Sequence, residues 1–217
     1  MSRAEPPKGC RRCPRLVAHR RTLARAHPDW WGGAVPSFGA ADARILILGL
    51  APGRMGAHRT GRAFTGDDSG RTLFEALTRN GLASGTYDSD GRDDIALQNT
   101  MITNALRCLP PDNRPTGEEL SACRPFLAAR IAALPRLRAV LCVGRVAHEA
   151  LLRCLDVPQT AAPFEHGAEH RLNGLQVFDS YHCSRYNMNT RRLTPSMLDA
   201  VLGRVRDAIM RDGNAPE

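Results

Sequence analysis

Lysine is almost absent from this chain, since Lys8 is the one lysine among its 30 basic residues. Aromatic side chains make up 5% of the 217 residues. No apolar run approaches the roughly 20 residues of a membrane-spanning helix, and segment 1–17 has no apolar stretch of signal-peptide length. These absences argue against a membrane-embedded or exported protein, so we expect a cytosolic protein without a membrane partner.

A familiar nucleotide-binding fingerprint is also lacking. Segment 49–67, GLAPGRMGAHRTGRAFTGD, is rich in glycine and follows the apolar run 45–48. It does not end in the Lys-Ser/Thr pair of a P-loop, and its glycines lack the spacing of a dinucleotide-binding turn. A nucleotide-binding metabolic enzyme is therefore disfavoured. The segment presents Phe64 and Asp67 where a P-loop would present lysine, so it predicts a different ligand.

Positive charge and apolar residues are present in quantity. The formal net charge is +8, and 42% of the residues are hydrophobic. This apolar content predicts a globular fold, and the chain length suits one α/β domain with its own core. Arginine binds phosphate in a planar, bidentate way, so the charge favours a nucleic-acid partner. A high-GC coding bias would give the same arginine count.

Short apolar runs alternate with amphipathic segments along the chain. The expected strands are 44–49, 101–106, 139–143 and 175–180, and the expected helices are 71–80, 117–134, 146–155 and 194–211. Thr116, followed by Glu118 and Glu119, is a start signal for the second helix. Strands that alternate with helices predict βαβ units and a parallel sheet covered on both faces.

Three polar segments follow predicted strands: 49–67, 103–113 and 180–195. In open α/β sheets, ligands bind beyond the carboxyl ends of the strands. We therefore expect these segments to converge on one site.

Seven cysteines in a reducing compartment argue against a disulfide framework and favour metal ligation for some of them. Cys10 and Cys13 form a CxxC pair, and Cys108 and Cys123 follow far along the chain. A zinc ribbon would need a second tight CxxC. Four thiolates from distant segments suit a cubane iron–sulfur cluster at least as well. The spacing also allows Cys108 and Cys123 to be ordinary buried residues.

Four stretches together carry a family resemblance: GLAPG…RTGRAFTGD at 49–67, TNALRCLPPDNRPT at 103–116, FEHGA at 164–168 and SYHCSRYNMNTRRLTP at 180–195. With the order of the cysteines, they resemble the iron–sulfur uracil-DNA glycosylases of the broad-specificity type B group, or family 5. The resemblance extends from about Cys10 to about Arg206.

The resemblance implies a three-layer α/β/α sandwich with a central four-stranded parallel sheet. It implies a DNA glycosylase of base excision repair that removes uracil, and also hypoxanthine, xanthine or ethenocytosine, to leave an abasic site. No lysine lies in a site motif to form a Schiff base, so the enzyme would be monofunctional. It would be a monomer in a bacterial or archaeal cytosol, associated with the nucleoid. The alternative is a non-catalytic iron–sulfur or zinc DNA-binding module on the same fold.

The family also implies a [4Fe–4S] cluster with a structural role. The residues that match its ligands are Cys10, Cys13, Cys108 and Cys123. The cluster would tie segment 1–40 to a single domain, 1–217, away from the chemistry.

The catalytic residues that the resemblance implies are Asp67, Asn113 and His182. A glycosylase extrudes its target nucleotide from the stack, and Phe64 matches the ring on which the flipped base would stack. Asp67, with Asn113, would hold the attacking water and stabilise an oxocarbenium-like sugar. His182 would stabilise the departing base. Asp68 is the rival of Asp67, or else helps to cap the helix that begins near position 69.

Further residues are assigned to the base and to DNA. Asn104 is expected to read the base edge with its amide, and it departs from the small residue usual in type B members. Ala51 and Gly53 are expected to line the base pocket, because glycine lets the backbone approach a ring closely. The predicted DNA-binding residues are Arg59, Arg185, Tyr186 and Asn189. Asn113, preceded by Pro110, Pro111 and Asp112, also fits an ordinary turn.

Overall fold

The computed structural model describes residues 4–211, and its centre is a six-stranded sheet in the order β1-β5-β2-β6-β8-β7. The inner strands are β5 (Thr100–Asn104), β2 (Ile45–Gly49), β6 (Ala139–Val143) and β8 (Leu175–Ser180). These four run parallel to one another. The predicted four-stranded parallel sheet is therefore confirmed, with strand positions that match to within two residues.

The two edge strands were not predicted. β1 (Phe38–Gly39) and β7 (Glu169–Leu172) pair antiparallel with β5 and β8. β1 has only two residues, and β7 alternates between exposed and half-buried positions. Neither therefore has the continuous apolar run that marks a strand buried on both faces.

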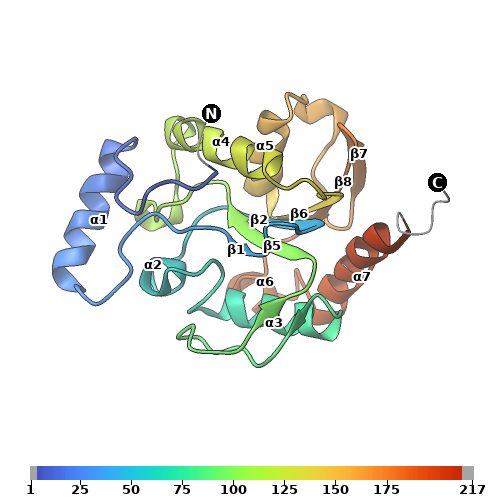
Figure 1. Ribbon diagram of the computed structural model, residues 1–217, viewed down its shortest axis with the longest axis horizontal. Helices are drawn as coiled ribbons and strands as arrows, with labels where there is room; N and C mark the ends of the chain where they lie inside the picture. Colours follow the sequence, from blue (N-terminus) through green and yellow to red (C-terminus); the bar gives the residue numbers. More distant parts are fainter. Residues whose placement is uncertain (1–3, 212–217) are drawn as a thin grey trace.

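Helices cover both faces of the sheet (Figure 1). α4 (Gly117–Ala132) and α5 (Arg145–Cys154) lie on one side, and α3 (Asp68–Arg79) and α7 (Pro195–Arg211) lie on the other. In β2, Ile45 and Ile47 pack with the α3 and α7 layer, whereas Leu46 and Leu48 pack with the α4 and α5 layer. Because side chains alternate along a strand, one apolar run supplies both halves of the core.

The predicted start of α4 is confirmed. Thr116 accepts the backbone N–H of Glu119 at 3.2 Å, and the Glu119 carboxylate accepts the N–H of Thr116 at 2.9 Å. This reciprocal arrangement is a capping box. Glu119 also forms an ion pair with Arg15 at 2.8 Å, so the same carboxylate links α4 to the N-terminal segment.

Three helices were missed. α1 (Pro14–Ala26) carries many arginines and buries just Leu16 and Leu23, so its apolar stripe is thin. α2 (Ala57–Thr60) and α6 (Arg185–Asn189) are too short for a periodic pattern. α1 lies at the opposite end of the molecule from α7 (Figure 1).

Smaller elements complete the described chain: β3 (Ala83–Ser84), β4 (Ala96–Leu97) and 3₁₀ turns at Pro111–Asn113 and Gln159–Ala161. Within residues 4–211, no helix combines the length and the apolar character needed to cross a membrane.

Candidate active site

A pocket of about 320 Å³ opens at the carboxyl ends of β2, β5 and β8. The predicted segments do converge there. Its lining includes seven of the predicted site residues: Ala51, Gly53, Phe64, Asp67, Asn104, Asn113 and His182. Leu50, Pro52, Ala57, Ser69 and Ser184 complete the wall. The two serines were not predicted, because serine in a loop gives no pattern of its own.

Phe64 forms one wall of the pocket. Its ring centroid lies 6.1 Å from that of His182, with an angle of 25° between the rings. Its backbone φ is 53°, a left-handed conformation that a bulky residue seldom adopts. A Cβ on Gly49 would lie 2.7 Å from the Phe64 ring, so the ring reaches this position because residue 49 has no side chain.

The two carboxylate oxygens of Asp67 have different surroundings. It is the N-cap of α3, and its Oδ1 accepts the N–H of Gly70 at 3.1 Å. Its other oxygen, Oδ2, lies against the glycine-rich loop, where a Cβ on Gly53 or Gly56 would come within 2.8 or 2.6 Å of it. One carboxylate oxygen thus fixes the side chain while the other faces the loop that lines the pocket.

The expectation that Asp68 helps to cap this helix is wrong. α3 begins at Asp68 itself, and the preceding residue caps it. An N-cap side chain accepts a bond from the second or third residue of the helix, and Asp67 stands at that distance from Gly70. Asp68 instead forms an ion pair with Arg185.

His182 follows β8 and lines the same pocket as Asp67. Burial lowers the pKa of its imidazole, although the Asp67 carboxylate acts in the opposite direction. Asn187 donates its side-chain amide to the His182 carbonyl at 2.8 Å, which holds the backbone. The ring is therefore neutral at physiological pH and can donate one N–H.

The two asparagines lie at different depths. Asn104 ends β5 and is 3% exposed, and a Cβ on Gly49 would lie 2.5 Å from its Oδ1. Asn113 is exposed at the rim, in the 3₁₀ turn, with a φ of 56°. The turn interpretation of Asn113 is correct, and the same turn also brings its side chain to the pocket.

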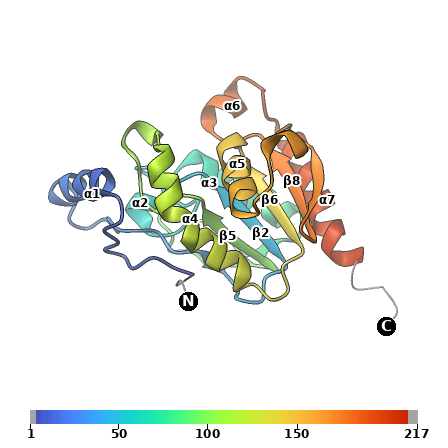
Figure 2. The same ribbon diagram turned by 90° about the horizontal axis from the view of Figure 1, so that it is seen from above.

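Three of the predicted DNA-binding residues lie on α6, which projects from the upper edge of the molecule in Figure 2. Arg185, Tyr186 and Asn189 are all exposed, and Tyr186 is 71% exposed. Ser184, the N-cap of α6, lines the pocket. Arg59 differs from them, because its guanidinium pairs with Asp90 at 2.7 Å and donates to two backbone carbonyls.

The four predicted cluster ligands lie around a second pocket, which shares no lining residue with the first. Cys10, Cys13, Cys108 and Cys123 line it together with apolar side chains. Burial raises the pKa of Cys108 to about 12 and that of Cys123 to about 11. The backbone N–H of Arg107 points to Cys123 Sγ at 3.4 Å, and an Arg20 N–H points to Cys108 Sγ at 3.9 Å.

This sulfur set fits a metal cluster. Buried thiols stay protonated without a counter-charge, whereas a metal ion deprotonates a coordinating thiol. N–H groups directed at the sulfurs also occur around iron–sulfur clusters, where they tune the potential. Four sulfurs and few other donors suit iron–sulfur or zinc ligation.

A different group of possible ligands lies in the core. The ligand atoms of Cys142, His148 and Asp179 are within 4.8 Å of one another. His148 Nδ1 bonds Asp179 Oδ1 at 2.8 Å, and His148 Nε2 bonds the Ala162 carbonyl at 2.8 Å. Although burial opposes it, the Asp179 carboxylate raises the pKa of His148. Both ring nitrogens are therefore already used in a hydrogen-bonded pair that links α5 to β8.

Comparison with known proteins gives a consistent result. The family model described as the uracil DNA glycosylase superfamily matches residues 36–206. A type-5 uracil-DNA glycosylase of Thermus thermophilus is 45% identical over 200 residues, which are 89% of this chain and 90% of the relative. That of Pyrobaculum aerophilum is 43% identical, over 90% and 87%. That of Mycobacterium tuberculosis is 42% identical, over 88% and 75%.

Proposed function

Since the chain belongs to the uracil DNA glycosylase superfamily, we propose that it hydrolyses the N-glycosidic bond between uracil and deoxyribose in DNA, in base excision repair. The type-5 relatives support this activity. The observation that carries the proposal is the pocket that Phe64, Asp67 and His182 line together, with the rings of Phe64 and His182 6.1 Å apart. Hypoxanthine, xanthine and ethenocytosine are proposed as further substrates.

The flipped base would bind against Phe64. A base must leave the stack before its glycosidic bond is accessible, and an aromatic ring offers it a new stacking partner. Asn104 at the floor of the pocket carries both a donor and an acceptor, which match the N3–H and O4 edge of uracil. Ala51 and Gly53 add a wall with little side-chain bulk.

Hydrolysis requires a water on the sugar and a stable leaving base. Asp67 is the carboxylate of the pocket lining, and Leu50 and Ala51 beside it can neither activate nor orient water. The Asp67 carboxylate would orient the water, with Asn113 at the rim, and would stabilise positive charge on the sugar. His182, held neutral by burial, would donate an N–H to uracil O2 as negative charge develops there.

Residues of α6 would bind the DNA. Tyr186 and Arg185 stand exposed just outside the pocket, where an inserted side chain would fill the gap left by the flipped base. Asn189 would contact the same strand, and the exposed Arg191 and Arg192 would contact phosphates. We propose a monomer that acts on DNA in the cytosol.

The direct test is to incubate the protein with an oligonucleotide that contains one uracil, followed by alkali. Strand cleavage at the uracil position is expected, and none in an oligonucleotide with thymine at that site. Binding without cleavage would favour the alternative, a non-catalytic DNA-binding module.

We also propose that Cys10, Cys13, Cys108 and Cys123 hold a [4Fe–4S] cluster. When bound, the cluster would supply a covalent cross-link between segment 1–40 and the sheet domain, with no part in base removal. The convergence of four cysteines on one pocket, Cys123 buried and the other three half-buried, supports it. Arg107 adds to the same link, because its fully buried guanidinium bonds Glu5 at 2.9 Å and the Val35 carbonyl at 3.1 Å.

Protein purified without oxygen should be brown, with absorbance near roughly 400 nm from thiolate-to-iron charge transfer. Cys108→Ala should lose this colour and much of its solubility and thermal stability. Cys154→Ala is the matched control, since Cys154 lies outside the pocket. Colourless wild-type protein with stoichiometric zinc would contradict the cluster, as would a fully stable Cys108→Ala protein.

A further inference from the structure

The active-site loop has an unusual backbone that other parts of the chain must hold. Phe64 has a φ of 53° and Gly66 a φ of 111°, and both lie within the three residues that precede Asp67. A bulky residue keeps a left-handed backbone where surrounding groups fix it, and such residues cluster at functional sites. The segment that contacts this loop is 85–94, which is itself largely exposed.

Tyr87 makes the contact closest to the site. Its hydroxyl oxygen accepts the backbone N–H of Gly66 at 3.1 Å. Its ring stacks on Phe74 of α3, with centroids 4.9 Å apart and 19° between the planes. A Cβ on Gly70 would lie 2.7 Å from the Tyr87 hydroxyl and 1.9 Å from the Phe64 carbonyl. The bare backbone at position 70 therefore lets this hydroxyl reach between Phe64 and Asp67.

The loop that carries Tyr87 is anchored by a nearly buried ion pair. Arg62 Nη1 and Nη2 bond the two Asp93 oxygens at 2.6 and 2.5 Å, and the Asp93 side chain is 2% exposed. Asp93 also accepts the N–H of Asp88 at 2.7 Å, directly after Tyr87. A bidentate arginine–carboxylate pair fixes orientation as well as distance.

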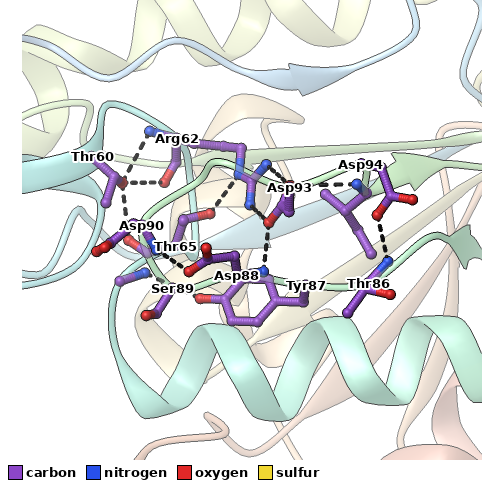
Figure 3. A network of polar contacts seen from close by, with 12 residues as sticks. Thr60, Arg62, Thr65, Thr86, Tyr87, Asp88, Ser89, Asp90, Asp93 and Asp94 are labelled. Carbon is purple, nitrogen blue, oxygen red and sulfur yellow. Dashed lines mark hydrogen bonds and ion pairs between the residues drawn. The ribbon is translucent and has the colours of Figure 1, made fainter.

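The same arginine reaches the active-site loop (Figure 3). Arg62 Nε donates to Thr65 Oγ1 at 2.8 Å, and Thr60 Oγ1 donates to the Thr65 carbonyl at 3.0 Å. Thr65 lies between Phe64 and Gly66 and is fully buried. Arg62 therefore holds one side of the strained turn, while the Tyr87 hydroxyl holds the other.

We propose that Tyr87, supported by the Arg62–Asp93 pair, is a positioning residue for the glycosylase reaction. It keeps the Phe64 ring and the Asp67 carboxylate in their working geometry before DNA binds. This inference rests on the proposed function. A displacement of about 1 Å at a reacting centre costs on the order of 10² in rate, so a single backbone hydrogen bond at this turn has a measurable effect on the chemical step.

The test uses Tyr87→Phe, which keeps the stacked ring and removes the acceptor of the Gly66 N–H. The single-turnover rate of uracil excision at saturating enzyme is expected to fall about tenfold, since the loop loosens without leaving the site. The Kd for uracil-containing DNA should change less than about twofold, and exchange of the Gly66 amide hydrogen should accelerate in the free protein. Asp93→Asn should change the rate and the exchange in the same direction.

Asp94→Asn is the matched control, because asparagine keeps an oxygen that can accept the N–H of Thr86, and the carboxylate that pairs with Arg62 is that of Asp93. It should match the wild-type rate and amide exchange. The inference is overturned if Tyr87→Phe excises uracil at the wild-type rate, or if Asp94→Asn slows excision as much as Tyr87→Phe does. It is also overturned if Tyr87→Phe weakens DNA binding but leaves the excision rate unchanged. If wild-type protein releases no uracil, the proposed function fails instead. The Gly66 amide exchange then decides by itself whether Tyr87 holds the loop.

Discussion

Asp67→Asn is expected to slow excision of every base by a similar factor, on the order of 10²–10³. The carboxylate is assigned to the water and to the sugar cation, which are common to all substrates. Asparagine is as good an N-cap as aspartate, so Oδ1 can keep its bond to the Gly70 N–H and α3 should stay intact. The substitution therefore removes the charge and leaves the fold.

The measurement is the single-turnover rate on uracil and on hypoxanthine, which removes product release from the comparison. Asp68→Asn is the control, because Asp68 pairs with Arg185 and does not line the pocket. It should excise uracil at nearly the wild-type rate at saturating enzyme. Full activity in Asp67→Asn would mean that Asp68 or Asn113 holds the water.

His182→Ala is expected to reduce uracil excision strongly and hypoxanthine excision much less. Uracil leaves as an anion that needs a hydrogen-bond donor, whereas hypoxanthine can leave after protonation. His182→Asn, which retains an N–H donor, should recover part of the uracil rate. An equal loss on both bases in His182→Ala, together with a base-dependent loss in Asp67→Asn, would reverse the two roles.

The pH dependence follows from the same assignment. Burial holds the pKa of His182 below its ordinary 6.5, so the neutral imidazole persists as pH falls through 6.5. The contribution of His182 to uracil excision should therefore be complete above that pH and still present somewhat below it. The ratio of wild-type to His182→Ala rates on uracil should stay constant between pH 8 and about 6.5. If this rate ratio decreases as the pH is lowered from 8 to about 6.5, the result would contradict a neutral histidine with a lowered pKa.

The residues of the active-site pocket were largely predictable because they come in motifs next to strands. The run 45–48 is apolar at every position, so it had to be a strand buried on both faces. Strands β2, β5 and β8 run parallel and end at one edge of the sheet, which brings Phe64, Asn104 and His182 together. The motifs supplied the residue identities, and sheet topology supplied their proximity.

The contacts between loops were not predictable in the same way. Tyr87 meets Gly66, Arg62 meets Asp93 and Asp68 meets Arg185 across long sequence separations. None of these side chains follows a periodic pattern or a spacing rule. The role of Asp67 as the N-cap was also missed, because two adjacent aspartates fit the start of α3 equally well and backbone geometry chose between them.

The sequence by itself determined the four inner strands, the covering helices, the capping box at Thr116 and the set of candidate ligands and pocket residues. The strands and helices follow from alternation and periodicity, and the capping box follows from a four-residue motif. The candidate ligands and pocket residues follow from the family resemblance of four segments and of the cysteine order. Tertiary structure alone decided the antiparallel edges of the sheet, the orientation of the Asp67 carboxylate, the grouping of the four cysteines and the contact of Tyr87 with Gly66. The physical reason is that such contacts depend on where loops meet beyond the ends of the strands, and local side-chain patterns do not encode those meeting points.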